Sequence, residues 1–252
     1  MRVENIPAYI LHSRPFKDTS AILDCFTSQY GLVSLVARGV RRPRASTYAL
    51  AQPFIFLQIG WVGRGDLKTL TQIEAAQLNP RLIGQKILLG MYLNEVLIRL
   101  LLRMDPHPQL FQEYDDTINA IAVTKNGFAL QVILRQFELK LLAELGYGLN
   151  LSGDVKSGQP ISADLLYSYD PNVGIFEASS TPPALQPVVV SGAAIIALCT
   201  GEFSTETELR EAKKLMRFVL AHYLGDKPLK SRQLFQTHKL HEEITHEPTE
   251  LQ

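Results

Sequence analysis

The sequence predicts an α+β protein: an N-terminal five-stranded OB-like β-barrel, then a mainly α-helical domain with a small irregular β-containing lobe. Three observations carry this prediction. The first 75 residues hold short apolar runs between turn residues, apolar residues recur at helical spacing from residue 84, and residues 150–191 are rich in Gly, Ser, Pro and Asp. Short apolar runs are typical of strands, and apolar residues three and four apart are typical of helices. We expect a barrel over residues 1–78, a helical domain over 79–237 with the lobe at 150–191, and a disordered acidic tail over 238–252.

Five strands are expected in the barrel. Their apolar runs are Ala8–Leu11, Ala21–Phe26, Leu32–Ala37, Phe54–Ile59 and Leu67–Ile73. The glycine-rich segment 60–66 between the last two suits a tight turn. Five short strands joined by turns favour a small closed barrel. An open antiparallel sheet packed on the helices is the alternative.

Four stretches with a helical period follow. Their apolar positions lie within residues 93–104, 110–121, 130–145 and 209–223. Pro106 and Pro108 end the first helix, and Thr205 with Glu208 forms a capping box at the start of the fourth. In the lobe, Leu165–Tyr169 and Gly174–Ala178 predict a β-hairpin.

The formal net charge is zero, but the charges are unevenly distributed. Residues 1–75 hold nine Lys and Arg against five Asp and Glu, whereas residues 236–252 hold one against four. A basic head favours a polyanionic partner there. Two cysteines, Cys25 and Cys199, are too few for a disulfide framework or a four-cysteine zinc site. Because the sequence has neither a secretory leader pattern nor an uninterrupted apolar span, we expect a cytoplasmic protein.

The sequence contains none of the common catalytic motifs that we searched for. There is no P-loop, no nucleophile elbow and no dinucleotide-binding glycine motif between a strand and a helix. His241 and His246 resemble a zinc motif, but side chains five apart diverge on a helix of ~3.6 residues per turn. Loose metal binding by these histidines with His238 is the alternative to a solvated tail. We expect no enzymatic activity, no catalytic residue, no cofactor and no metal.

Basic residues gather in the predicted loops of the barrel. Residues 38–44 include four arginines. A guanidinium group can fork onto a phosphate, and oligonucleotides lie on OB barrels against the loops after strands one and four and the face of strands two and three. We expect DNA contacts from Arg14, Lys17, Arg38, Arg41, Arg42, Arg44, Arg64 and Lys68.

Two further groups are candidates for the same interface. Aromatic residues near the loops are candidates for base stacking: Tyr30, Phe54, Phe56 and Trp61. Phe54 and Phe56 lie two apart on one strand face, which favours the barrel core instead. A second basic group after the last helix consists of Lys227, Lys230 and Arg232. It either adds phosphate contacts or interacts favourably with the C-terminal end of that helix.

Several segments resemble the RecO family of DNA repair recombination mediators. Near the N-terminus the resemblance lies in residues 9–15, 18–27 and 31–39. In the helical part it lies in 135–139, in the Leu-Gly-Tyr-Gly at 145–148, and in the Tyr-Leu-Gly-Asp-Lys-Pro-Leu-Lys-Ser-Arg at 223–232. The last two motifs are specific in combination, and the resemblance covers nearly the whole chain.

The resemblance implies an OB-fold domain on a helical domain, with no catalytic residue. It implies binding of single- and double-stranded DNA, annealing of complementary strands, and association with the bacterial nucleoid. The implied partners are RecR, the C-terminal tail of single-stranded DNA-binding protein and, indirectly, RecA. Arg135 lies in the segment that matches the family's groove for that acidic tail. Some family members carry a four-cysteine zinc site, but residues 151–158 contain no cysteine here, so the lobe is expected to hold its shape by packing alone.

Two other classes of function remain open at this point. The barrel of an interaction adaptor would bind a protein, and its basic loops would be incidental. A nuclease would need Asp115, Asp116 or Asp154 to hold Mg²⁺, although these carboxylates lie on different predicted elements.

Overall fold

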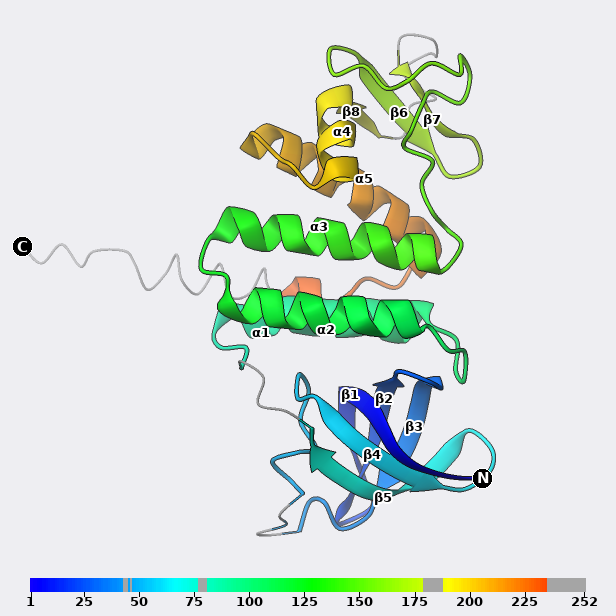
Figure 1. The fold of residues 1–252 in the computed structure, drawn as a ribbon, viewed down its shortest axis with the longest axis vertical. Coiled ribbons are helices and arrows are strands. Elements are labelled where there is room, and N and C mark those ends of the chain that lie inside the picture. Colours follow the sequence, from blue (N-terminus) through cyan, green and yellow to red (C-terminus); the bar gives the residue numbers. More distant parts are fainter. Residues whose placement is uncertain (43–44, 46, 77–80, 179–187, 235–252) are drawn as a thin grey trace, which may run out of the picture. The chain divides into compact units, whose positions relative to one another are not determined.

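This computed structural model describes residues 1–42, 45, 47–76, 81–178 and 188–234 (Figure 1). The chain divides into two compact units. The barrel unit comprises Met1–Pro108 together with the chain from Asp226, and the helical unit comprises Gln109–Gly225. The acidic tail, Arg44 and the histidines at 238, 241 and 246 lie outside the described residues.

Five strands close into a barrel in the order β1-β2-β3-β5-β4. They are β1 (Arg2–Phe16), β2 (Ser20–Thr27), β3 (Gly31–Ala37), β4 (Leu57–Val62) and β5 (Leu67–Ala75). β1 pairs with β4 through its first half and with β2 through its second, with a register shift in each pairing. Only the β3–β5 pair is parallel. The predicted closed barrel is confirmed, and the open sheet is excluded.

Alternate side chains of each strand fill the barrel interior. Leu23, Cys25, Leu35 and Ile59 are fully buried there, and so is Trp61. Burial, with a smaller contribution from the charge of Asp24, raises the pKa of the Cys25 thiol, which therefore stays protonated. The barrel thus has an apolar core of its own, to which the segment between β3 and β4 adds Val40 and Ala51.

The prediction that Phe54 and Phe56 belong to the barrel core is wrong. The strand predicted from Phe54 begins at Leu57, because Phe54 adopts a left-handed φ of 67°. Phe56 instead packs edge-on against Tyr9, with ring centroids 5.4 Å apart. The ring of Phe54 lies so close to Gly90 that a Cβ there would be 2.6 Å from Cε1 of the ring.

Helix α1 (Gln85–Leu100) and the segment after it cover part of the outside of the barrel. The side-chain amide of Asn94 donates to the Leu11 carbonyl at 2.8 Å, and the Met104 N–H donates to the Leu32 carbonyl at 3.1 Å. Arg103 lies 3.4 Å from the buried Asp24 carboxylate. The helix was predicted to reach residue 104 but ends at Leu100, where the chain leaves the helix to pair with β3.

The helical unit contains four helices and a three-stranded sheet among the described residues. The helices are α2 (Pro108–Val123), α3 (Gly127–Glu144), α4 (Gly192–Thr200) and α5 (Glu206–Leu224). The sheet has the order β7-β6-β8 and consists of β6 (Leu166–Asp170), β7 (Gly174–Glu177) and β8 (Val189–Ser191). The predicted hairpin and the capping box at Thr205 are confirmed. Helix α4 was not predicted, because its residues are apolar on nearly every side and show no helical period.

A buried carboxylate organises the loop that leads into the lobe. Asp154 is 4% exposed and accepts backbone N–H groups from Lys156 at 2.6 Å, Ser157 at 3.0 Å and Glu177 at 2.7 Å. Burial alone would raise the pKa of this carboxyl, but these hydrogen bonds outweigh burial and lower it. The expectation that packing alone holds the lobe is therefore incomplete.

The motif at residues 223–232, which we call the C-terminal signature, forms a turn and leads into a helical segment at residues 230–234. The Glu95 carboxylate of α1 accepts the N–H groups of Lys230 and Ser231, both at 2.8 Å, and the Ser231 hydroxyl at 2.7 Å. Pro228 therefore does not prevent a helical start two residues later. In the described part of the chain, no helix has the length and apolar character to cross a membrane.

Candidate nucleic-acid interface

Two loops meet at one end of the barrel and bring together most of the cations that were predicted in the barrel. The Arg41 N–H donates to the Thr19 carbonyl at 2.9 Å, which ties the loop after β3 to the tip of the β1–β2 hairpin. On the outside of the sheet, Arg14 is paired with Ile22, and Ile22 with Val36, so the same end also holds Arg14. We call this group the basic end of the barrel: Arg14, Lys17, Arg38, Arg41 and Arg42.

The loop after β3 takes its shape from its backbone rather than from ion pairs. Gly39 adopts a φ of 69°, which favours glycine, and the Arg42 N–H closes the turn onto the Gly39 carbonyl at 3.0 Å. All five side chains of the basic end are exposed. Within the described ranges, none of them forms a salt bridge with a carboxylate. Their charge is therefore available to a ligand.

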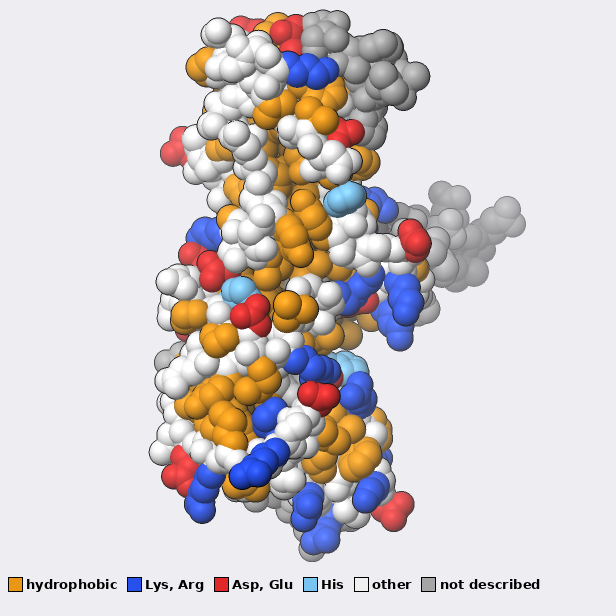
Figure 2. Space-filling view, turned by 90° about the vertical axis from the view of Figure 1, so that its right-hand side faces the viewer, with side chains coloured by type: hydrophobic (Ala, Val, Ile, Leu, Met, Phe, Trp, Pro, Cys, Tyr) orange, Lys and Arg blue, Asp and Glu red, His pale blue; other side chains and the backbone are white. Residues whose placement is uncertain are grey.

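Figure 2 shows one face of the barrel, where Lys and Arg side chains outnumber Asp and Glu. The outer face of β2 and β3, where an OB barrel would bind an oligonucleotide, is largely covered in this protein. Phe26, Leu32, Asp24 and Ser34 all point outward there and are buried. Only the part near Val36, next to the basic end, remains partly exposed.

The other predicted DNA contacts lie elsewhere. Arg64 is exposed in the β4–β5 turn, which leads into β5 beside Ser34 and so lies away from the end of β3. Lys68 is 5% exposed, and its amine donates to the Gly65 carbonyl at 2.9 Å. Lys227 and Lys230 are exposed in the C-terminal signature, and Arg232 is partly exposed.

The aromatic candidates for base stacking are mostly occupied within the protein. Trp61 belongs to the barrel core and is fully buried, so the suggestion that it stacks on a base is wrong. Tyr30 is partly buried and packs edge-on against Trp61, with centroids 5.2 Å apart. This candidate interface therefore offers a nucleic acid mainly positive charge rather than exposed aromatic rings for stacking.

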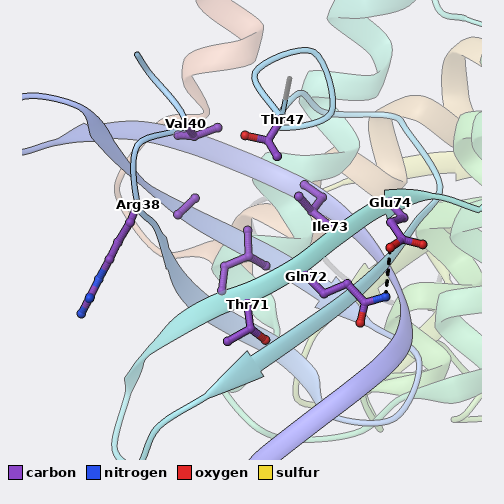
Figure 3. Close-up of a pocket in the computed structure, with 9 residues that line it drawn as sticks. Arg38, Val40, Thr47, Thr71, Gln72, Ile73 and Glu74 are labelled. Carbon is purple, nitrogen blue, oxygen red and sulfur yellow. Dashed lines mark hydrogen bonds between the residues drawn. The ribbon is translucent and has the colours of Figure 1, made fainter. Parts of the chain in front are cut away.

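A cavity of about 360 Å³ adjoins the basic end (Figure 3). It lies between the end of β3, the loop after it, and the second half of β5. Its described lining residues are Ala37, Arg38, Val40, Thr47, Leu70, Thr71, Gln72, Ile73 and Glu74. Sequence reasoning missed it, because the cavity depends on how the loop folds over β5.

In the helical unit, Arg135 is 6% exposed and lies 2.5 Å from the Glu138 carboxylate, three residues later on α3. The Arg135 Nε has no hydrogen-bond partner among the described residues. An apolar cavity of about 550 Å³ lies in the same unit between Leu139 and Ala143 of α3, residues 148–152 and 160–161, and Ile196 of α4. No Lys or Arg is among the described residues that line it.

A basic face on α5 was missed by sequence reasoning. Arg210, Lys213, Lys214 and Arg217 are all exposed there. Their spacing of three and four residues places them on one side of the helix, opposite the buried stripe that includes Leu209, Ala212 and Met216. The sequence carried this signal, but only the apolar half of the pattern was used.

The comparisons with known proteins agree with this architecture. Residues 1–79 match the family described as Recombination protein O N terminal, and residues 83–233 match Recombination protein O C terminal. The chain is 45% identical to the DNA repair protein RecO of Nitrosococcus oceani over 236 residues, which cover 94% of each chain. It is 38% identical to that of Azoarcus sp. over 93% of this chain and 96% of the relative. It is 41% identical to the DNA repair protein RecO of Pseudomonas aeruginosa strain UCBPP-PA14, over 92% of this chain and 94% of the relative.

The fold and these likenesses define a DNA repair protein built from an OB-like barrel and a helical body. The chain belongs to the RecO family.

Proposed function

We propose that this protein is a recombination mediator that binds DNA without catalytic turnover. The observation that supports this most directly is the basic end of the barrel. Its cations come from the end of β1 and from two loops that the Arg41–Thr19 backbone hydrogen bond joins, and they are exposed and without carboxylate partners among the described residues. Guanidinium and ammonium groups that neutralise phosphates release counterions, so binding of this kind weakens steeply with salt. The binding surface includes Arg14, Lys17, Arg38, Arg41 and Arg42, and the same proposal extends to Arg44.

Annealing requires that two complementary strands approach each other. We propose that the basic face of α5 contacts DNA in addition to the basic end of the barrel. Neutralised phosphates repel each other less, so two strands held by one protein can meet. Arg64, Lys227, Lys230 and Arg232 are further proposed phosphate contacts, whereas the buried amine of Lys68 supports the β4–β5 turn.

The proposal is tested by fluorescence anisotropy of a labelled single strand across a salt series. Replacing Arg38, Arg41 and Arg42 together with Ala is expected to weaken binding and to make it less salt-dependent, by about one unit of slope for each lost phosphate contact. The matched control is Arg2→Ala, because Arg2 is paired with Glu4 at 2.6 Å. If the protein fails to shift single strands even at low salt, the barrel is better explained as a protein-binding module.

We further propose that the protein works with RecR and with single-stranded DNA-binding protein to help load RecA. The acidic, apolar-ended tail of single-stranded DNA-binding protein would place its apolar end in the cavity beside α3 and α4. Because Arg135 is buried against Glu138, we propose that it positions α3 at this site.

A tail peptide tests this part of the proposal. Ile196→Asp places a charge at the cavity and is expected to reduce peptide binding while DNA binding is retained. Arg135→Ala is expected to do the same and also to lower stability, since it removes the ion pair that Arg135 forms with the buried Glu138 carboxylate. If peptide and DNA binding fall together, or if neither falls, the assignment is wrong.

A further inference from the structure

The cavity beside the basic end arises where two parallel strands separate. β3 and β5 pair only through Ser34–Val36 and Leu67–Thr69. Beyond that point β5 continues to Ala75, paired with β4 on its other side. In the described part of the chain no strand pairs with the free edge of β5 there. Its backbone N–H and C=O groups therefore face a space of about 360 Å³.

The cavity combines an apolar floor with polar edges. Leu70 and Ile73 are partly buried and pack against the barrel core, and Val40 from the loop is buried in that core. In Figure 3, Val40 and Thr47 lie on the same side of β5 as Ile73. A flat group with an apolar face and donors and acceptors along its edge suits these surroundings, and the volume is in the range of ~300–1,000 Å³ typical of small-ligand sites.

Opposite charges mark the two ends of the cavity. The Arg38 side chain extends away from the other lining residues, toward the outside (Figure 3). At the other end, the Glu74 carboxylate accepts a hydrogen bond from the Gln72 amide at 3.3 Å. A phosphate is favoured at the Arg38 end and disfavoured near Glu74. A ligand with an anionic group outside and an uncharged planar group inside matches this polarity.

We propose that this cavity takes one nucleobase of the strand held at the basic end. Arg38 would bind the phosphate next to that base, the apolar floor would contact the face of the base, and the edge of β5 with Thr47 would meet its polar edge. The inference rests on the proposed DNA binding and adds a base contact to an interface that otherwise reads only the backbone. An extended peptide added to the free edge of β5 is the competing occupant, but the surrounding cations favour a nucleic acid.

The test compares a labelled single strand with an abasic strand of the same length, at fixed salt, by anisotropy. The wild-type protein is expected to bind the abasic strand about fivefold to tenfold more weakly, as the loss of one base contact implies. Thr47→Phe fills the cavity and is expected to lower the affinity for the base-containing strand to the abasic level, while the abasic affinity and the salt dependence stay unchanged. Ala49→Phe is the matched control, because Ala49 is exposed two residues away and does not line the cavity.

Three outcomes overturn the inference. If the wild-type protein binds both strands with equal affinity, it makes no base contact, although the proposed DNA binding still holds. A base preference that Thr47→Phe leaves intact places the base elsewhere. Equal loss for both strands in Thr47→Phe shows that the loop, not the cavity, matters. If neither strand binds the wild-type protein at any salt concentration, the proposed function itself has failed.

Discussion

Two loops of this protein use charge in opposite ways. In the loop after β3, Arg38, Arg41 and Arg42 are exposed, and backbone hydrogen bonds define the turn. In the loop at residues 154–158, the Asp154 carboxylate is buried and binds backbone N–H groups of its own loop and of Glu177. The first loop would keep its shape without its charges, and the second would not.

The difference separates charge that serves binding from charge that serves folding. A charge that is already satisfied inside the protein contributes to stability and offers little to a ligand, whereas an exposed cation without a partner contributes little to stability. Mutations at the two loops should therefore have complementary effects. For each of the following substitutions, both DNA binding and stability are measured, because only the two readouts together test the comparison.

The largest expected effect on DNA binding is that of Arg41→Glu. The change removes one cation from the basic end and adds an anion beside Lys17, whose carbonyl lies 3.5 Å from the Arg41 guanidinium. We expect single-strand affinity at low salt to fall by about a hundredfold. Because Arg41 is exposed, the free energy of unfolding should change by less than about 0.5 kcal/mol. Anisotropy and urea denaturation check the two parts, and a large loss of stability would contradict the comparison.

The reverse pattern is expected for Asp154→Asn. The amide keeps one acceptor oxygen but places an N–H₂ group against a backbone donor, either Glu177 or the pair Lys156 and Ser157. Buried hydrogen bonds to a charged group contribute ~1.5–3 kcal/mol each, so we expect a loss of about 3 kcal/mol. Urea denaturation measures it, and hydrogen exchange at Glu177 localises it. DNA affinity should stay within about twofold of wild type.

The effect of Asp154→Asn should also depend on pH. Since the folded-state pKa of Asp154 is lowered, its ionised form stabilises the fold at any pH above the unfolded value of ~3.9, and this contribution is lost as the pH falls through the folded pKa. The stability difference between wild type and Asp154→Asn should therefore be full at pH 7 and should shrink below about pH 4. A difference that grows on acidification would mean that the carboxylate is not the stabilising group.

The two loops were not equally accessible to sequence reasoning. Composition and turn chemistry were enough to predict that the arginines of the first loop form an exposed basic group, because charge density is a local property. The contact of Arg41 with Thr19, which brings the basic end together, depends on the β2–β3 register and on how the loop turns after β3, and it could not be predicted from the sequence. The role of Asp154 was less accessible still, because one of its partners, Glu177, lies 23 residues away.

The fold shows the same division between local and long-range information. The capping box at Thr205 and the glycine-rich β4–β5 turn were predictable from neighbouring residues. The run Phe54–Ile59 carried no alternation, so its apolar side chains could not be assigned to a face, and Phe54 and Phe56 were placed in the wrong layer. Gly90 resolves the position of Phe54, since the ring occupies the space that a Cβ would need.

The smallest effect is expected for Glu95→Gln, which tests whether the charges of the C-terminal signature serve folding or binding. The Glu95 carboxylate holds the backbone of this segment, as Asp154 holds the backbone of its loop. Lys227 and Lys230 are exposed, as are the arginines of the loop after β3. The pKa of Glu95 is lowered, because hydrogen bonds from Ser231 and Lys230 outweigh its partial burial. Glutamine keeps one acceptor, and the site is partly open to water, so we expect a loss of about 1 kcal/mol or less. Hydrogen exchange at Lys230 and Ser231 should rise. If DNA affinity falls together with stability, the segment presents its cations to DNA, and its charges serve both folding and binding. If only stability changes, Lys227 and Lys230 do not contact DNA.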